Sequence, residues 1–315
     1  MSSDSDLATQ ATCNDASTCK RYAVQKGYWN DPYISHMVKS VGSRKPPEIN
    51  RGYYARVESV WILIKKFIHA TERKCQIVSL GAGLDTTFWR LCGEELSPIR
   101  YIELDFPNVT MRKVQTIKSK TLLTQAFNTS ENDTKIETSS IISNKYSLLP
   151  ADLRDIELVE KQLKLAQIDF TIPTLFLTEC VLVYMSSKNS NAILKWVTTN
   201  FENCMFVNYE QVNMNDRFGH VMIENLKSRD CDIPGVDVCE SLESQRKRFQ
   251  ENGWDQVNCI TMWSVYSILP QSDVQRMERL EFMDEQELLE QLLTHYCLCW
   301  ATKAGESFNL KEIEL

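Results

Sequence analysis

The sequence predicts an α/β protein with a mostly parallel sheet, on three observations. First, the apolar run Ile77 to Leu80 ends in Gly-Ala-Gly and is followed by apolar residues at helical spacing, which indicates a strand, a tight turn and a helix. Second, predicted strands alternate with predicted helices repeatedly along the chain, the order expected for a parallel sheet with crossover helices. Third, the stretch from Pro173 to Met185 is the most apolar segment, which suits a central strand covered on both faces.

The glycine turn and the next strand predict a nucleotide-like ligand. Gly81 and Gly83 would let a ligand approach bare backbone. The dinucleotide pattern requires Gly or Ala where this chain has Thr86, so the pyrophosphate fingerprint is incomplete. About twenty residues on, Glu103 and Asp105 end a second strand, at the spacing that places a carboxylate beside ribose hydroxyls. S-adenosylmethionine, which has a ribose and no phosphate, fits best, and we prefer Asp105 because it lies nearer the carboxyl end.

Three regions follow one another along the chain. Residues 1–18 are polar and are predicted to be a disordered tail. Residues 19–72 are rich in aromatic side chains and predict a helical cap, with one helix from Ile49 to Ala70. Residues 73–315 predict the α/β domain, with insertions at about 107–146 and 212–245, the first including a polar stretch at 128–140. A long charged helix is expected from Val274 to Leu293, followed by a closing strand.

Other polar residues also fall at predicted strand ends or among apolar neighbours. Glu179 interrupts the most apolar strand, where an unpaired carboxylate would be costly, so we expect it to contact cofactor or substrate. Asp152 is predicted either to accept a hydrogen bond from an adenine amine or to cap the following helix. Lys20 and Arg56 are either solvated charges or ligands of a carboxylate.

Composition limits the classes of partner. Hydrophobic residues make up 43% and charged residues 24%, as in ordinary globular proteins. The net charge of −7 argues against a nucleic-acid partner, and no apolar run is long enough to cross a membrane. The eleven scattered cysteines favour reduced thiols in a cytoplasmic protein. The acidic composition and the lack of heptads favour a monomer.

Several stretches together resemble the leucine carboxyl methyltransferases, from about residue 13 to the end of the chain. The resemblance implies a class I S-adenosylmethionine-dependent methyltransferase, a Rossmann-like fold whose mostly parallel seven-stranded sheet has an antiparallel last strand, with an N-terminal helical cap. The stretches include Lys20-Arg21, Gly27-Tyr28-Trp29-x-Asp31-Pro32-Tyr33, Leu80-Gly81-Ala82-Gly83-x-Asp85-Thr86-Thr87, Glu179-Cys180-Val181-Leu182-Val183-Tyr184-Met185 and Tyr296-Cys297-Leu298-Cys299-Trp300-Ala301.

The resemblance also implies roles for single residues and a substrate. The substrate would be the C-terminal leucine α-carboxylate of the protein phosphatase 2A catalytic subunit, whose methyl ester would regulate holoenzyme assembly, with S-adenosylhomocysteine as the second product. Arg56 and Tyr184 would position this substrate, and the corner 208–211 would face its entrance. Of the residues implied to bind the cofactor, Lys20 and Arg56 would contact its methionine carboxylate and Glu179 its amino group. Asp105 would bind the ribose, and Asp152 and Leu153 would contact the adenine. Gly81 would let the cofactor lie close to the first strand.

The implied chemistry requires little from the protein. A C-terminal carboxylate has a pKa of about 3.5, so it is already a nucleophile at neutral pH. We therefore expect in-line attack on the sulfonium methyl group without a general base or a metal, helped by positioning and by removal of water. A methyltransferase for small carboxylic acids or hydroxyl groups and a non-catalytic adaptor for the phosphatase remain the alternatives.

Overall fold

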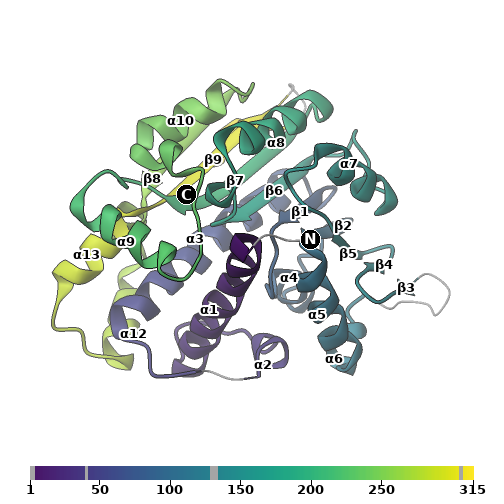
Figure 1. Ribbon diagram of the computed structural model, residues 1–315. Coiled ribbons are helices and arrows are strands. Elements are labelled where there is room, and N and C mark those ends of the chain that lie inside the picture. Colours follow the sequence, from purple (N-terminus) through teal and green to yellow (C-terminus); the bar gives the residue numbers. More distant parts are fainter. Residues whose placement is uncertain (1–3, 40–41, 128–133, 305–307) are drawn as a thin grey trace.

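The computed structural model describes residues 4–39, 42–127, 134–304 and 308–315. Across these residues, helices cover both faces of one sheet of nine strands (Figure 1). Its five central strands run parallel in the order β5-β2-β1-β6-β7, which confirms the predicted mostly parallel sheet. These strands are Tyr146–Pro150 (β5), Arg100–Asp105 (β2), Gln76–Leu80 (β1), Thr174–Glu179 (β6) and Cys204–Gln211 (β7).

The last strand of the chain lies inside the sheet. β9 (Tyr296–Lys303) is inserted between β7 and β8 (Gln256–Thr261) and is antiparallel to both, which confirms the predicted direction of the last strand. The five parallel strands together with β8 and β9 are the seven strands predicted. A hairpin of two-residue strands, β3 (Lys135–Ile136) and β4 (Ile141–Ile142), extends the sheet beyond β5. Strands this short show no periodicity, so the sequence did not reveal them. Of the polar stretch at 128–140, residues 128–133 lie outside the described residues.

Two hydrophobic cores, one on each face of the sheet, hold the helices in place. In the first core, Trp61, Ile64 and Phe67 of α3 (Pro47–Ala70) pack with buried strand residues. These positions recur every three or four residues and so share one face of a helix. The helix predicted from Ile49 to Ala70 is confirmed. The second core contains side chains from α7 (Ile156–Leu165), α8 (Ser187–Asn200) and α10 (Leu242–Gln250).

An N-terminal helix, α1 (Asp4–Lys26), occupies most of the region predicted to be disordered. It packs on α3, and its buried residues Ser17, Cys19 and Ala23 are small. Small residues contribute little to the hydrophobicity of a segment, so the composition gave no sign of a helix that neighbouring elements stabilise. The prediction of a disordered tail over 1–18 is therefore wrong for residues 4–18, and residues 1–3 lie outside the described part. Residues 19–72 contain the rest of α1, α2 (Ile34–Met37) and α3.

The long helix predicted from Val274 to Leu293 is wrong, because the chain forms two helices there. α12 (Gln271–Leu280) and α13 (Gln286–Thr294) are separated at Glu281, whose backbone is extended. The Glu281 carboxylate accepts hydrogen bonds from Tyr28 Oη at 3.2 Å and Asn50 Nδ2 at 2.7 Å. These long-range contacts fix Glu281 outside a helix, and they cannot be read from the local sequence.

The two predicted insertions contain further helices. The first includes α5 (Pro107–Lys118), α6 (Thr121–Thr124) and the short hairpin. The second includes α9 (Arg217–Lys227), a 3₁₀ turn at Val236–Glu240 and the start of α10. The remaining helices are α4 (Thr87–Gly93) and α11 (Met262–Ser267), with 3₁₀ turns at Leu182–Tyr184 and Leu310–Glu312. Among the described residues, no helix combines the length and the apolar character that a membrane crossing requires.

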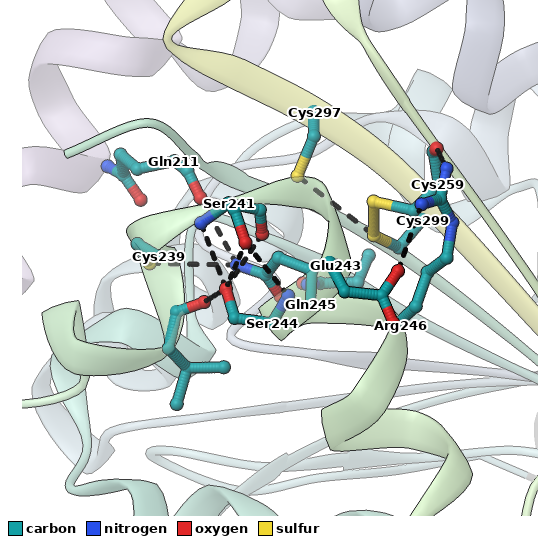
Figure 2. The surroundings of a disulfide bond; sticks show 12 residues. Gln211, Cys239, Ser241, Glu243, Ser244, Gln245, Arg246, Cys259, Cys297 and Cys299 are labelled. Atoms are coloured by element: carbon teal, nitrogen blue, oxygen red, sulfur yellow. Dashed lines mark hydrogen bonds and ion pairs between the residues drawn. A yellow bond between two sulfur atoms is a disulfide. The ribbon is translucent and has the colours of Figure 1, made fainter. Parts of the chain in front are cut away.

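One pair of cysteines is bonded, contrary to the prediction of reduced thiols. Cys259 of β8 and Cys299 of β9 form a disulfide between residues that face each other in register, with Cα atoms 4.1 Å apart. Figure 2 shows Cys297 beside this disulfide, with its Sγ 4.0 Å from Cys299 Sγ. The two partners lie forty residues apart in sequence, so only the strand register identifies them as a pair. The other nine cysteines are free thiols.

Candidate active site

A cavity of about 440 Å³ opens at the carboxyl ends of the parallel strands. Its floor comes from the loops that follow β1, β2, β5 and β6, which is where ligands bind in sheets of this type. Its cover comes from α1 and α9, which contribute residues between 6 and 20 and between 222 and 229. Every residue predicted to bind the cofactor lines this cavity, as does Tyr184; the set is Lys20, Arg56, Gly81, Asp105, Asp152, Leu153 and Glu179.

The glycine turn after β1 is required by close packing as well as by backbone conformation. Gly81 has a φ of +67°, and a Cβ atom there would lie 2.6 Å from Val181 Cγ2. Gly83 has a φ of +52°, and its Cβ would lie 2.9 Å from Cys13 Sγ of α1. Any larger residue would therefore force Val181 or Cys13, both of which line the cavity, to move.

Asp105 and Glu103, the two rival carboxylates of β2, have different surroundings. Asp105 lies in the cavity wall, and its oxygens accept hydrogen bonds from Gly83 N and Phe106 N, both at 2.7 Å. Burial raises its pKa. Glu103 does not line the cavity; it is buried against Lys113 Nζ at 2.6 Å and Tyr146 Oη at 2.7 Å. The structure thus places Asp105, and not Glu103, where a ribose could be bound.

Glu179, at the end of β6, is the centre of a charged cluster. Arg56 Nε lies 2.5 Å and Lys20 Nζ lies 3.2 Å from Glu179 Oε2, and Lys20 also approaches Asp85 at 3.4 Å. Burial raises the pKa of Glu179, but Lys20 and Arg56 outweigh this effect and hold the pKa below its usual range. Despite burial, Lys20 and Lys113 lower the pKa of Asp85 to about 2. The carboxylates of Glu179 and Asp85 are therefore ionised at neutral pH.

Asp85 is a site residue that sequence reasoning missed. It follows the glycine turn directly, and its position within that motif is the signal that could have identified it. Its Oδ1 accepts a hydrogen bond from Thr87 N at 2.7 Å, which fixes the carboxylate at the start of α4. Tyr53 and Tyr296 also line the cavity. Both lie in stretches that resemble the family, but neither was assigned a role.

In the part of the cavity floor that follows β5, Arg154 is the central side chain. Its guanidinium binds Asp152 at 2.6 Å and also Asp6 of α1 at 2.9 Å. Asp152 does not cap the next helix, so that alternative is wrong: the N-cap of α7 is Asp155, which accepts from Leu158 N. Arg154 and Asp6 were not predicted, because α1 is far away in sequence.

The other end of the cavity surrounds one predicted residue, Tyr184, which together with Met222 and Leu226 packs against a small buried apolar cluster. Burial raises its pKa, so its phenol stays protonated. Of the corner predicted at 208–211, only Gln211 lines the cavity, which corrects that prediction. Asn208 instead accepts from Thr178 Oγ1 at 2.8 Å, and Tyr209 stacks on Tyr296, because alternate residues of a fully covered strand point into the two cores. The remaining side chains at this end are Met185, Met222, Asn225, Leu226 and Arg229.

The fold and the site together define a class I S-adenosylmethionine-dependent methyltransferase. In the sheet, five parallel strands are followed by the antiparallel strand β9. The glycine turn after β1 and the acid at the end of β2 line one cavity at the carboxyl ends of the parallel strands. A putative methyltransferase from Thermobifida fusca has the same fold, with a TM-score of 0.54 over 86% of this chain and 93% of its own and with 13% sequence identity.

Sequence comparisons identify the family. The family model described as leucine carboxyl methyltransferase matches residues 8–198. The chain is 52% identical to leucine carboxyl methyltransferase 1 of Rattus norvegicus and 53% identical to that of Bos taurus, in each case over 98% of this chain and 93% of the relative. The chain belongs to the leucine carboxyl methyltransferase family. It is therefore an enzyme that uses S-adenosylmethionine to methylate carboxyl groups.

Proposed function

We propose that this enzyme methylates the C-terminal leucine α-carboxylate of the protein phosphatase 2A catalytic subunit, and that the resulting methyl ester regulates assembly of the phosphatase holoenzyme. The main support is that the cavity continues beyond the predicted cofactor residues. Its far end combines Met185, Met222 and Leu226 with the Tyr184 phenol. Apolar side chains of this size suit the side chain of a leucine, while the exposed rim leaves room for the chain that precedes it.

The residues at the first end fit S-adenosylmethionine. The charged cluster of Lys20, Arg56, Asp85 and Glu179 has no net charge, so an amino acid head group with both charges can be bound without leaving a buried charge unpaired. In this proposal Glu179 accepts from the ammonium group, and Lys20 and Arg56 donate to the carboxylate. Asp105 accepts only two backbone N–H groups, so lone pairs remain for the ribose hydroxyls.

When bound, the cofactor supplies the electrophilic methyl group. The protein positions the substrate carboxylate and excludes water from it. Burial raises the pKa of Tyr53, Tyr184 and Tyr296, so these phenols donate hydrogen bonds and do not act as bases. A carboxylate is already ionised at neutral pH, so a base is not needed. Tyr184 and Arg56 are the residues we expect to orient it.

We also propose that recognition extends to the folded surface of the phosphatase. A tail of a few residues buries little area, and specific protein complexes bury far more. Efficient methylation of an isolated tail peptide would contradict this part of the proposal. We further propose that the enzyme acts as a monomer in the cytoplasm, where nine free thiols would stay reduced.

The proposed reaction can be tested with S-adenosylmethionine that carries a radiolabelled methyl group. Purified phosphatase catalytic subunit, intact and lacking its last leucine, is incubated with the enzyme. We expect label on the intact protein only, released by mild base as an ester would be. Label on free leucine or short peptides without the phosphatase would favour a small-molecule enzyme. Cofactor binding without any methyl transfer would favour a non-catalytic adaptor.

A further inference from the structure

Four cationic side chains line the cavity within the described residues, and three of them are held by strong partners. Lys20 and Arg56 are both bound to Glu179 in the buried cluster. Arg154 contacts two carboxylates, those of Asp152 and Asp6. Arg229 differs, because its ion pair is a single contact of 3.3 Å with Asp15 of α1. The side chains of this pair are 61% and 70% exposed, so Arg229 is the cation most readily available to an incoming ligand.

The position of Arg229 relates it to the substrate end of the cavity. It follows the end of α9, and its Nε donates to the carbonyl oxygen of Asn225 at 3.3 Å. Met222 and Leu226 lie four residues apart and so share one face of α9, and Arg229 follows in the turn after the helix; all three line the cavity. The apolar residues of this face are followed by the arginine at the exposed rim.

The negative charge of the protein favours a cation at this rim for the binding of an anionic substrate. The chain has a net charge of −7, which disfavours the approach of an anionic substrate, and Asp6 and Asp15 lie on the cover of the same cavity. Lys20 and Arg56 are already neutralised by Glu179 and Asp85, and they are the expected partners of the cofactor's own carboxylate. Among the lining residues described, this leaves Arg229 as the cation that meets the substrate carboxylate at the rim, before Tyr184 and Arg56 orient it inside the cavity.

We propose that Arg229 binds the α-carboxylate of the substrate as it enters the cavity, in exchange for Asp15. An exposed ion pair contributes little to stability, so Asp15 is displaced at small cost, and a guanidinium can bind a carboxylate through two parallel hydrogen bonds. The methyl ester has no negative charge and loses this contact. Arg229 therefore favours binding of the free acid and release of the ester. This inference rests on the proposed function in one respect, that the substrate is a protein chain end.

The first test is kinetic and uses the phosphatase catalytic subunit as substrate. For Arg229→Gln we expect KM for the phosphatase to rise roughly tenfold, with kcat and cofactor affinity unchanged, because one charged hydrogen-bonding partner is lost. Arg229→Lys should restore part of the loss. Lys227→Gln, which removes a positive charge from the exposed end of α9 outside the cavity, is the matched control and should leave KM unchanged. An unchanged KM in Arg229→Gln, or an equal rise in Lys227→Gln, would overturn the inference.

The second test does not require methyl transfer. Binding of the phosphatase catalytic subunit, as free acid and as methyl ester, is measured to the full-length enzyme loaded with S-adenosylhomocysteine. The enzyme should bind the acid more tightly, Arg229→Gln should remove this preference, and Asp15→Asn should keep it. Equal binding of acid and ester by the unchanged enzyme would overturn the role of Arg229. A clear preference without any methylation would support that role and count against the proposed function alone.

Discussion

The two ends of the cavity are built from different kinds of structure. At the cofactor end, Gly81, Asp105 and Glu179 lie at or directly after the ends of parallel strands. The Glu179 charge is buried and paired with Lys20 and Arg56, and Asp105 is held by two backbone N–H groups. At the substrate end, the turn after α9 contributes Arg229 and the middle of α1 contributes Asp15, and their ion pair is exposed. The sheet thus supplies a fixed site for the cofactor, while the helices supply an adaptable entrance. Four substitutions test this difference, beginning with the largest expected effect.

Removal of the negative charge at the centre of the cofactor end should have the largest effect. In Glu179→Gln, Lys20 and Arg56 lose their shared partner in a largely buried site. Breaking a buried pair costs about 3 to 5 kcal/mol, so we expect a comparable loss of stability. Affinity for S-adenosylhomocysteine should fall at least about a hundredfold. Denaturant unfolding and calorimetric titration measure the two effects. Glu243→Gln, which breaks an exposed pair with Arg246, is the control and should change neither quantity. Equal behaviour of the two variants would show that the cluster is not what holds the cofactor.

Gly81→Ala tests whether the turn after β1 is as rigid as its packing indicates. The new Cβ would lie 2.6 Å from Val181 Cγ2, and the left-handed backbone costs a residue with a side chain roughly 1 to 2 kcal/mol. We expect reduced stability and weaker cofactor binding, because Val181, which lines the cavity, is displaced. The double variant with Val181→Ala should regain cofactor affinity, but its stability should stay reduced because the left-handed backbone at position 81 remains. If Gly81→Ala binds the cofactor normally, the turn is more adaptable than described.

Glu210 allows a pH test near the substrate end. Burial raises its pKa from an ordinary value near 4.5 to about 7, and its Oε2 accepts from Val183 N, the neighbour of Tyr184, at 2.9 Å. The folded protein then binds a proton that the unfolded chain releases, so stability should fall as the pH rises from about 4.5 to 7. The decline for this group is on the order of 3 kcal/mol. In Glu210→Gln, the free energy of unfolding should depend less on pH over this range, which unfolding experiments at several pH values can measure. An identical slope in both proteins would refute the assignment.

The smallest effect is expected for the ion pair between Asp6, near the start of α1, and Arg154. Asp6→Asn weakens the pair with Arg154, which is partly exposed. Such pairs contribute up to about 1 kcal/mol, so release of S-adenosylhomocysteine should accelerate by about fivefold or less. Stopped-flow fluorescence can follow this release. Asp4→Asn removes the same charge from an exposed position on the same helix and should leave the rate unchanged. Slower release in Asp6→Asn would contradict the view that α1 covers the bound cofactor.

The same contrast explains what the sequence could predict. The positions of Asp105 and Glu179 followed from strand patterns, because parallel strands bring their carboxyl ends to one edge of the sheet. Asp6, Asp15 and Arg229 reach the site only through the packing of helices distant in sequence, and no local pattern marks them. The break at Glu281 and the pairing of Cys259 with Cys299 also depend on long-range contacts. The sequence thus predicted the floor of the cavity but, of its cover, only Lys20.

The place of β9 in the sheet has a consequence for how the protein is made. This strand is the last in the chain, yet it lies between β7 and β8 and is the only described partner of β8. During synthesis, β7 therefore has an open edge and β8 has no partner until residues 296–303 leave the ribosome. Open strand edges pair readily with other chains. A nascent or prematurely terminated chain is thus expected to aggregate or to require a chaperone, although most of its cofactor-binding residues are already present.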